Sequence, residues 1–285
     1  MRLTNYNEFR NDLRKYGIEY AAERSARLGF DSVEFLDLCP IAAEARVPER
    51  VNASDVRRVC EQNGLKVACY SLGADLLASD RDELKKQLCQ QIEFAAEIGT
   101  PYIHHTLVRS LSPDSRVLSY ESVFDSIVGT AVWIANRCKT YGLTCLYEPQ
   151  GLYFNGVDRL KHFFECVRQE CSNVAICGDV GNSLFVDTSA NDIYDAFIDS
   201  IRHVHLKDFQ VSDQPFENGV CFRSINGKYL RECQLGQGVV DLGYCFQKLK
   251  EQKYQGAISF EFDGDDSVLS AAIQLVRTTL LKFRF

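Results

Sequence analysis

The chain has 285 residues, of which 46% are hydrophobic and 25% charged, with 6 prolines and 18 glycines. These proportions exclude collagen-like, low-complexity and intrinsically disordered proteins. Lys and Arg number 32 against 39 Asp and Glu, and the net charge of −7 argues against a protein that binds nucleic acid by neutralising phosphates. A prior of roughly 150 residues per domain suggests about two domains, but one α/β barrel of about 250 residues fits equally well.

From about residue 30, short apolar segments that end in a polar or charged residue alternate with longer segments of helical periodicity. The short segments predict strands at 32–37, 65–71, 101–107, 143–148, 173–179, 202–208 and 256–262. The longer segments predict helices at Asn52–Asn63, Arg81–Ile98, Val117–Tyr141, Val157–Glu170, Ala190–Ser200 and Leu242–Gln252. Several helices end on a glycine just before the next strand, as in QNGLKVACY and TYGLTCLYE, which is typical of a C-terminal cap.

The seven alternations follow one another without a linker-like segment, which favours one domain with a parallel sheet. A doubly wound sheet should carry a glycine-rich phosphate turn, and the sequence has neither G-x-G-x-x-G nor a Walker A pattern. We therefore predict an α/β protein, a single-domain (β/α)8 TIM barrel over residues 1–285. Its eighth strand should come first in the sequence, so it is either short and irregular near Leu3–Tyr6 or missing.

One long irregular connection, residues 209–240, follows the predicted strand RHVHLKD. In a barrel it forms a loop on the catalytic face, and loops of this length are uncommon unless they bind ligands or act as lids. Its Arg223, Lys228, Tyr229 and Arg231 suit closure over a polar substrate.

The 12 cysteines are scattered from Cys39 to Cys245 without a C-x-x-C pair, so neither a zinc ribbon nor a disulfide framework is expected. The opening sequence MRLTNYNEFRNDLRKY lacks the apolar segment of a signal peptide, and no apolar run predicts a membrane span. We expect a cytoplasmic protein with reduced thiols.

Barrel enzymes place their reactive groups at the C-terminal ends of the strands. Four consecutive predicted strands end there in Glu148, Asp179, His205 and Glu261. Three carboxylates and one imidazole suit a divalent cation, with Mn²⁺ or Mg²⁺ favoured over Zn²⁺ or Co²⁺. Without a cation the carboxylates would repel, and at least one would take up a proton. A carboxylate that ends a strand is more often a helix N-cap, so the prediction depends on all four residues sharing one structural position.

Four segments resemble the xylose-isomerase-like barrel superfamily: Glu-Pro after a strand, Gly-Asp-Val-Gly-Asn, His-Val-His-Leu-Lys-Asp and LGQGVVDLGYCFQKLKEQKYQGAISFEFDG. More narrowly, they are similar to its branch of sugar and sugar-phosphate isomerases and epimerases. The resemblance runs from about residue 17 to the end and is strongest over residues 140–264. It implies that Glu148, Asp179, His205 and Glu261 bind one divalent metal and that the two glutamates flank the substrate carbon. It also implies homo-oligomers, since barrels of this branch are commonly dimers or tetramers.

Removing a proton beside a ketone or aldehyde forms an enediolate, whose oxyanion needs fixed positive charge nearby. A metal that bridges the carbonyl and the adjacent hydroxyl supplies that charge. We therefore expect a metal-dependent isomerase or epimerase of a sugar or sugar phosphate, in which Glu148 and Glu261 pass the proton.

Two further candidates for substrate contacts share the inward side of the strand with His205. His203 lies deeper, where a hydrogen-bonded core histidine is the alternative interpretation. Lys207 lies nearer the barrel mouth, where an ion-paired lysine is the alternative.

Three more candidates come from other parts of the chain. His104 and His105 face opposite sides of their strand, and similarity to the family favours His105 as the residue in the site. Asn182 stands where some ketose epimerases carry a substrate-binding histidine, which puts their free-sugar specificity in doubt for this chain. Arg223 is a candidate for a substrate oxygen or phosphate, against the alternative of an exposed loop arginine.

Three other functions are weighed against this prediction. A lyase or dehydratase of the inosose or dehydroshikimate type would use the same barrel and metal but expel a hydroxyl. An apurinic endonuclease needs several zinc ions and more histidine ligands than the 5 histidines present can supply. A non-catalytic sugar-binding barrel would carry no metal.

Overall fold

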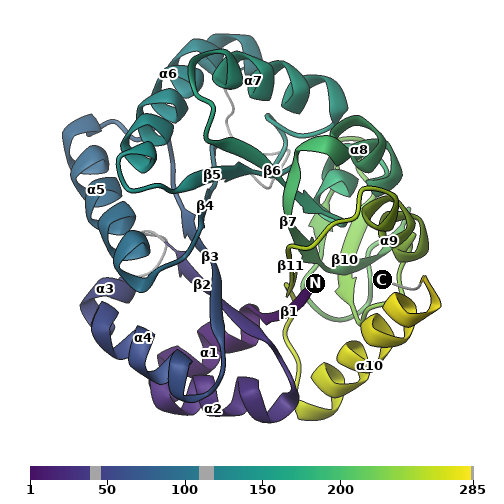
Figure 1. Ribbon diagram of the computed structural model, residues 1–285. Helices are drawn as coiled ribbons and strands as arrows, with labels where there is room; N and C mark the ends of the chain where they lie inside the picture. Colours follow the sequence, from purple (N-terminus) through teal and green to yellow (C-terminus); the bar gives the residue numbers. More distant parts are fainter. Residues whose placement is uncertain (39–45, 109–118, 284–285) are drawn as a thin grey trace.

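The computed structural model describes residues 1–38, 46–108 and 119–283, which form one closed barrel of parallel strands inside a ring of helices (Figure 1). The predicted single-domain TIM barrel is confirmed. The barrel strands are β1 (Arg2–Asn5), β2 (Ser32–Leu38), β3 (Lys66–Gly73), β4 (Tyr102–His105), β5 (Thr144–Tyr147), β6 (Val174–Asp179), β7 (Ile201–Leu206) and β11 (Ala257–Phe260). They lie around the barrel in that order, and β11 closes it against β1.

The outer ring consists of α1 (Asn7–Tyr16), α2 (Ile18–Leu28), α3 (Val47–Arg50), α4 (Ala53–Gln62), α5 (Arg81–Ile98), α6 (Tyr120–Lys139), α7 (Val157–Glu170), α8 (Ala190–Phe197), α9 (Leu242–Glu251) and α10 (Asp266–Lys282). Short 3₁₀ helices occupy Asn182–Val186 and Ile198–Ser200. The six predicted helices are present with ends within about three residues of the prediction, and the predicted start of α6 at Val117 lies outside the described residues. No helix in the described part of the chain has the length and apolar character that a membrane span requires.

The first strand is neither irregular nor missing. β1 pairs in parallel with β11 over all four of its residues and with β2 over two. The polar residues of β1 disfavour a strand when the sequence is considered alone. In the folded chain, residues from other elements form hydrogen bonds with them. The Thr4 and Ser32 hydroxyls lie 2.6 Å apart, and the Asn5 amide donates to the Ser25 hydroxyl at 2.8 Å. Buried hydrogen bonds of this kind offset the cost of removing polar groups from water.

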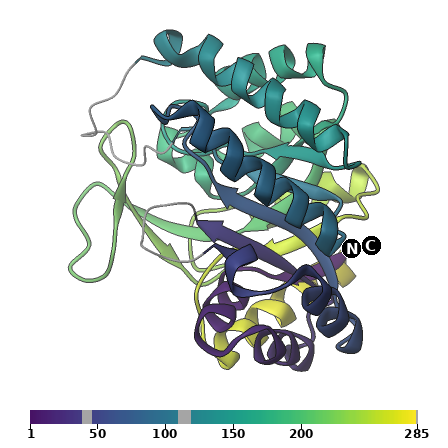
Figure 2. The same ribbon diagram turned by 90° about the vertical axis from the view of Figure 1, so that its left-hand side faces the viewer.

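The long connection after β7 is more regular than predicted. It contains a three-stranded antiparallel sheet in the order β8 (Asp208–Ser212), β10 (Tyr229–Cys233) and β9 (Phe222–Arg223). Figure 2 shows this sheet projecting from one end of the barrel. An apolar cluster of Leu152, Phe185, Phe209 and Leu230 joins it to the loops beside it. Of the polar residues that suggested a lid, Arg223, Tyr229 and Arg231 therefore lie on this sheet, and Lys228 lies in the turn between β9 and β10.

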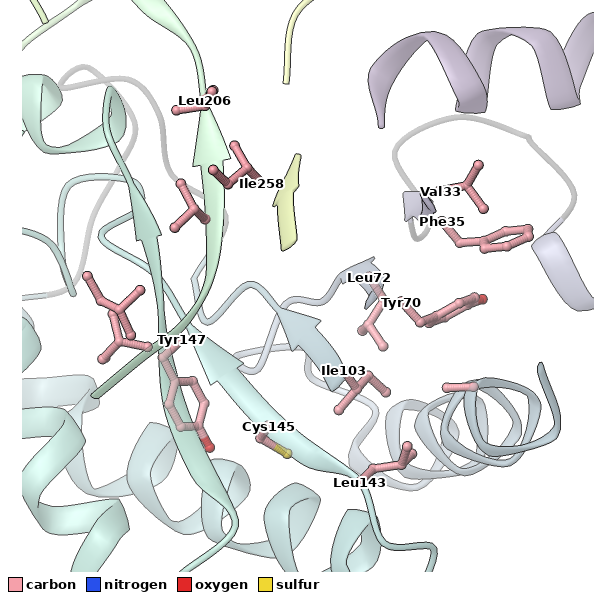
Figure 3. Close-up of a cluster of buried hydrophobic side chains, with 14 of the residues drawn as sticks. Val33, Phe35, Tyr70, Leu72, Ile103, Leu143, Cys145, Tyr147, Leu206 and Ile258 are labelled. Carbon is pink, nitrogen blue, oxygen red and sulfur yellow. The ribbon is translucent and has the colours of Figure 1, made fainter. Parts of the chain in front are cut away.

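The apolar core lies between the barrel strands and the surrounding helices. On β2, Val33 and Phe35 are fully buried on the outer side, and Phe35 packs against Tyr70 of β3 with ring centroids 6.2 Å apart (Figure 3). Because side chains alternate along a strand, the residues between them face the barrel interior. At the C-terminal end of the barrel that interior is polar, and this polar lining forms the site described below.

Candidate active site

Four side chains meet at the C-terminal mouth of the barrel, one from the end of each of β5, β6, β7 and β11. They are Glu148, Asp179, His205 and Glu261, and their ligand atoms all lie within 4.8 Å of one another. Glu148 Oε2 and Glu261 Oε2 each lie 3.0 Å from His205 Nδ1, while Asp179 Oδ2 lies 3.9 Å from it. The structure therefore brings together the four residues that the sequence singles out.

The donor set fits a divalent metal ion. Three carboxylates and one imidazole nitrogen are the ligands that Mn²⁺, Mg²⁺ and Zn²⁺ accept. Glu261 Oε2 faces His205 Nδ1 and, among the described residues, has no hydrogen-bond partner although it is buried. A buried carboxylate oxygen whose close contact is one histidine nitrogen would be stabilised further by a cation or a bound molecule. An ion held by Glu148, Asp179, His205 and Glu261 would stabilise it in this way.

Lys207 supplies a fixed positive charge beside this cluster. Its ammonium donates to Glu261 Oε1 at 2.6 Å and to Asn182 Oδ1 at 3.0 Å, and it lies 3.2 Å from Asp179 Oδ2. Burial alone would lower the pKa of Lys207, but Asp179 and Glu261 hold it above its ordinary value. The lysine is therefore an ion-paired member of the site and stays charged.

The acidic groups differ in their protonation. Burial raises the pKa of Asp179, and although Lys207 opposes the rise, Glu261 and Glu148 bring the value to about 7. Burial also acts to raise the pKa of Glu148, but His104 and His205 hold it below its ordinary range. Asp179 is thus the carboxyl of the three whose pKa is raised, first by burial and then by its two carboxylate neighbours.

The turn after β6 aims Asp179 and Asn182 at the site. Asp179 Oδ1 accepts the backbone N–H groups of Gly181 at 2.8 Å and Asn182 at 2.6 Å, which leaves Oδ2 toward the cluster. A Cβ at Gly181 would overlap Lys207 Cγ, so only glycine allows the lysine to pass. The Asn182 side-chain nitrogen is buried and has no hydrogen-bond partner in the described part of the chain, so it can donate to a ligand.

Sequence reasoning missed Glu34 and set His104 aside in favour of His105. Glu34 of β2 is fully buried beneath the cluster and contacts His203 Nε2 at 2.7 Å and His205 Nε2 at 3.1 Å. His104 Nε2 lies 3.4 Å from Glu148 Oε1, and its Nδ1 lies 3.0 Å from the Ser71 hydroxyl. The signal for Glu34 was a charged residue inside the apolar strand SVEFLD, at a position that faces the interior.

The remaining predicted residues lie in different places. His203 is a fully buried, hydrogen-bonded residue below His205, which matches its alternative interpretation as a core histidine. His104, and not His105, faces the cluster; His105 points to the outer side of β4, where its ring lies 5.3 Å from Tyr147. This corrects the choice that similarity to the family favoured. Arg223 is exposed on β9, with its guanidinium 5.7 Å from the centre of the Tyr229 ring.

Solved structures with the same fold come from several enzymes and cover almost the whole chain. The structure of an L-ribulose 3-epimerase has a TM-score of 0.76 at 16% identity, covering 99% of this chain and 95% of that one. The IOLI protein with a binding zinc atom has a TM-score of 0.71 at 16% identity, with 99% and 98% covered. The probable 3-DHS dehydratase AsbF from Bacillus anthracis has a TM-score of 0.71 at 14% identity, with 97% and 99% covered.

A search of curated proteins found no match to this sequence. The family model of the xylose isomerase-like TIM barrel matches residues 22–279, which is most of the chain. This chain therefore belongs to the xylose isomerase-like TIM barrel family.

Proposed function

We propose that the protein is a divalent-metal-dependent isomerase or epimerase of a sugar or sugar phosphate. One observation carries the proposal: Glu148 and Glu261 approach the same nitrogen of His205, at 3.0 Å each, from strands on either side of it. Two carboxylates that share one centre can serve a single substrate carbon as base and acid.

The site residues have two roles, metal binding and proton transfer. Glu148, Asp179, His205 and Glu261 would hold the ion, which when bound polarises a carbonyl and its neighbouring hydroxyl. Burial acts to raise the pKa of Glu261, but Lys207 lowers it below its ordinary value, so this group is ionised. Glu148 is likewise held as a carboxylate beside His104 and His205. Either glutamate can then take a proton from the carbon beside the carbonyl, and the other can return one.

The surroundings of the cluster suit a substrate rich in oxygen. The unpaired amide nitrogen of Asn182 offers a buried donor to a hydroxyl or phosphate oxygen, and the Lys207 ammonium beside it adds positive charge. The similarity to an L-ribulose 3-epimerase supports a sugar as the substrate, and the similarity to a zinc-containing barrel supports a metal.

A second candidate is a metal-dependent dehydratase, because a probable 3-DHS dehydratase has the same fold with most of the chain covered. Both reactions begin by removing a proton next to a carbonyl. They differ in the next step, since a dehydratase expels a hydroxyl group whereas an isomerase or epimerase returns the proton.

The test uses the full chain in deuterium oxide with a panel of ketoses, ketose phosphates and cyclic polyol ketones. With Mn²⁺ we expect deuterium to enter the carbon next to the carbonyl of at least one sugar, giving an epimer or isomer, and EDTA to stop the exchange. An unsaturated, dehydrated product would favour the dehydratase. Exchange that is unchanged by EDTA, or no exchange with any compound, would contradict the proposal.

A further inference from the structure

Glu34 lies at the centre of a buried hydrogen-bond network directly beneath the metal-binding cluster. Its carboxylate faces four donors from three other strands: Ser71 of β3, His203 and His205 of β7, and Ser259 of β11. Both serine hydroxyls donate to it. The side chain is fully buried, so these contacts alone replace the water that a carboxylate would otherwise bind.

His205 stands between Glu34 and the cluster and presents one ring nitrogen to each. Its Nε2 lies 3.1 Å from Glu34 Oε1, and its Nδ1 lies 3.0 Å from Glu148 Oε2. A metal can bind Nδ1 only when that nitrogen carries no proton, and a neutral imidazole then keeps its proton on Nε2. Glu34 is placed to accept that remaining N–H. The Tyr6 ring also stacks against the His205 ring, with the two ring centres 4.9 Å apart.

We propose that Glu34 is a positioning residue that holds His205 in the tautomer and orientation required for metal binding through Nδ1. The inference rests on the proposed metal-dependent function, because it assigns the metal to the four residues at the barrel mouth. A carboxylate that accepts the second N–H of a ligating histidine fixes the ring and raises its affinity for the metal.

A competing arrangement is a second ion held by Glu34, His203 and His205, whose ligand atoms also lie within 4.8 Å of one another. The contacts favour the positioning role. Oε2 of Glu34 already meets His203 and Ser259, and Oε1 meets His205 and Ser71. An ion there would have to displace the protons of both imidazoles and would require a second nitrogen of His205 to lose its proton.

The test compares Glu34→Gln with Asp37→Asn. Asp37 is a buried carboxylate on the same strand but on its outer face, where it accepts the Tyr70 hydroxyl at 2.7 Å. Both variants exchange one buried carboxylate for an amide of the same shape. We expect E34Q to bind Mn²⁺ and Co²⁺ about 10- to 100-fold more weakly by titration calorimetry, and D37N to bind them as the unmodified protein does.

A second readout follows the histidine itself. In protein loaded with Zn²⁺ and labelled with ¹⁵N-histidine, we expect His205 to show a proton on Nε2 whose resonance shifts in E34Q, because its acceptor is no longer a carboxylate, and stays unchanged in D37N. If E34Q does not fold, Ser259→Ala, which removes one donor to Glu34, should weaken Co²⁺ binding several-fold. Metal affinity and an Nε2 signal that stay unchanged in the substituted protein would overturn the inference.

Stoichiometry separates the remaining outcomes. Two ions per chain in the unmodified protein, falling to one in E34Q, would show that Glu34 is itself a ligand and would also overturn the inference. If the unmodified protein binds one ion but catalyses no exchange, the proposed function fails while the role of Glu34 is still measured by metal affinity. If exchange is intact and E34Q binds the ion normally, only the inference about Glu34 fails.

Discussion

The ammonium of Lys207 lies 2.6 Å from Glu261 Oε1, in a site where the lysine side chain is only 5% exposed. The lysine also lies 3.2 Å from Asp179 Oδ2, so it contacts two of the three carboxylates that converge there. The chain thus carries part of the positive charge that the cluster needs, and a divalent ion would complete it. We therefore expect the stability of the protein to depend on whether this site holds an ion.

Replacing Lys207 with methionine should destabilise the metal-free protein and make its free energy of unfolding depend more strongly on bound metal. Removing one partner of a buried ion pair costs about 3–5 kcal/mol of unfolding free energy, because the other charge is left unpaired. Urea unfolding in EDTA should show this loss of unfolding free energy. Adding Mn²⁺ should raise the unfolding free energy of the variant by more than it raises that of the unmodified protein.

Lys248→Met is the matched control. Lys248 pairs with Asp195 at 2.6 Å, but the two side chains are 30% and 51% exposed, so its loss should leave the free energy of unfolding nearly unchanged. A K207M protein as stable as the unmodified one in EDTA would show that Lys207 does not compensate the buried carboxylates.

Replacing either Glu148 or Glu261 with glutamine should abolish proton transfer and leave the fold intact. General acid–base groups contribute about 10²- to 10⁴-fold to the rate, and here each also contributes to the metal set. Steady-state kinetics on the substrate found by deuterium exchange measures the loss, and circular dichroism checks the fold. Glu251→Gln, an exposed position on α9, should keep full activity. An E261Q variant with a near-normal rate would remove Glu261 from the mechanism.

Replacing Gly238 with alanine should loosen the segment that follows β10. Asp208 accepts the backbone N–H groups of Gly236 and Gly238 at 2.9 Å each and of Val240 at 3.1 Å, and a Cβ at Gly238 would overlap its carboxylate. Forced overlap of this kind costs about 1–3 kcal/mol. Limited proteolysis should therefore cut G238A faster within residues 208–240.

Gly129→Ala supplies the comparison for that experiment. Gly129 lies inside α6, where a Cβ would meet no heavy atom within 4 Å beyond its chain neighbours and the surrounding helix backbone, so alanine should stabilise the helix by about 0.5–1 kcal/mol. Equal cleavage of G238A and the unmodified protein would mean that Asp208 does not organise this segment.

His105 should make the protein less stable in mild acid. Burial lowers the pKa of His105 from 6.5 to about 4 in the folded protein. Between these values the unfolded chain binds more protons than the folded one, so the free energy of unfolding falls as the pH decreases from 6.5 toward 4. One pKa unit corresponds to about 1.4 kcal/mol, so this group should cost about 2 kcal/mol at pH 5 relative to pH 7.5.

Urea unfolding at the two pH values measures this effect. His105→Phe, which cannot take up a proton, should reduce the difference by about that amount. His162→Phe, at an exposed histidine of α7, should leave the difference in place. An unchanged pH dependence in H105F would show that His105 is not the group responsible.

The alternation of strands and helices and the convergence of four side chains could be predicted from the sequence. Apolar periodicity and glycine caps mark the elements, since they report on local backbone preference and on which face is buried. Parallel strands also end at one rim of a barrel, so Glu148, Asp179, His205 and Glu261 could be placed together without coordinates. These inferences require only the direction of each strand and the alternation of its side chains between the two faces.

Features that depend on strand register and on partners far apart in the chain could not be predicted without the folded structure. The pairing of Ser71 with His104 between β3 and β4 turns His104 inward and His105 outward, a choice that parity alone leaves open. The polar strand β1 is stable because β2, α2 and β11 satisfy it. Glu34 and His203 lie 169 positions apart, and only the closed barrel brings them within 2.7 Å. A buried carboxylate is tolerated where partners surround it, and those partners come from other strands.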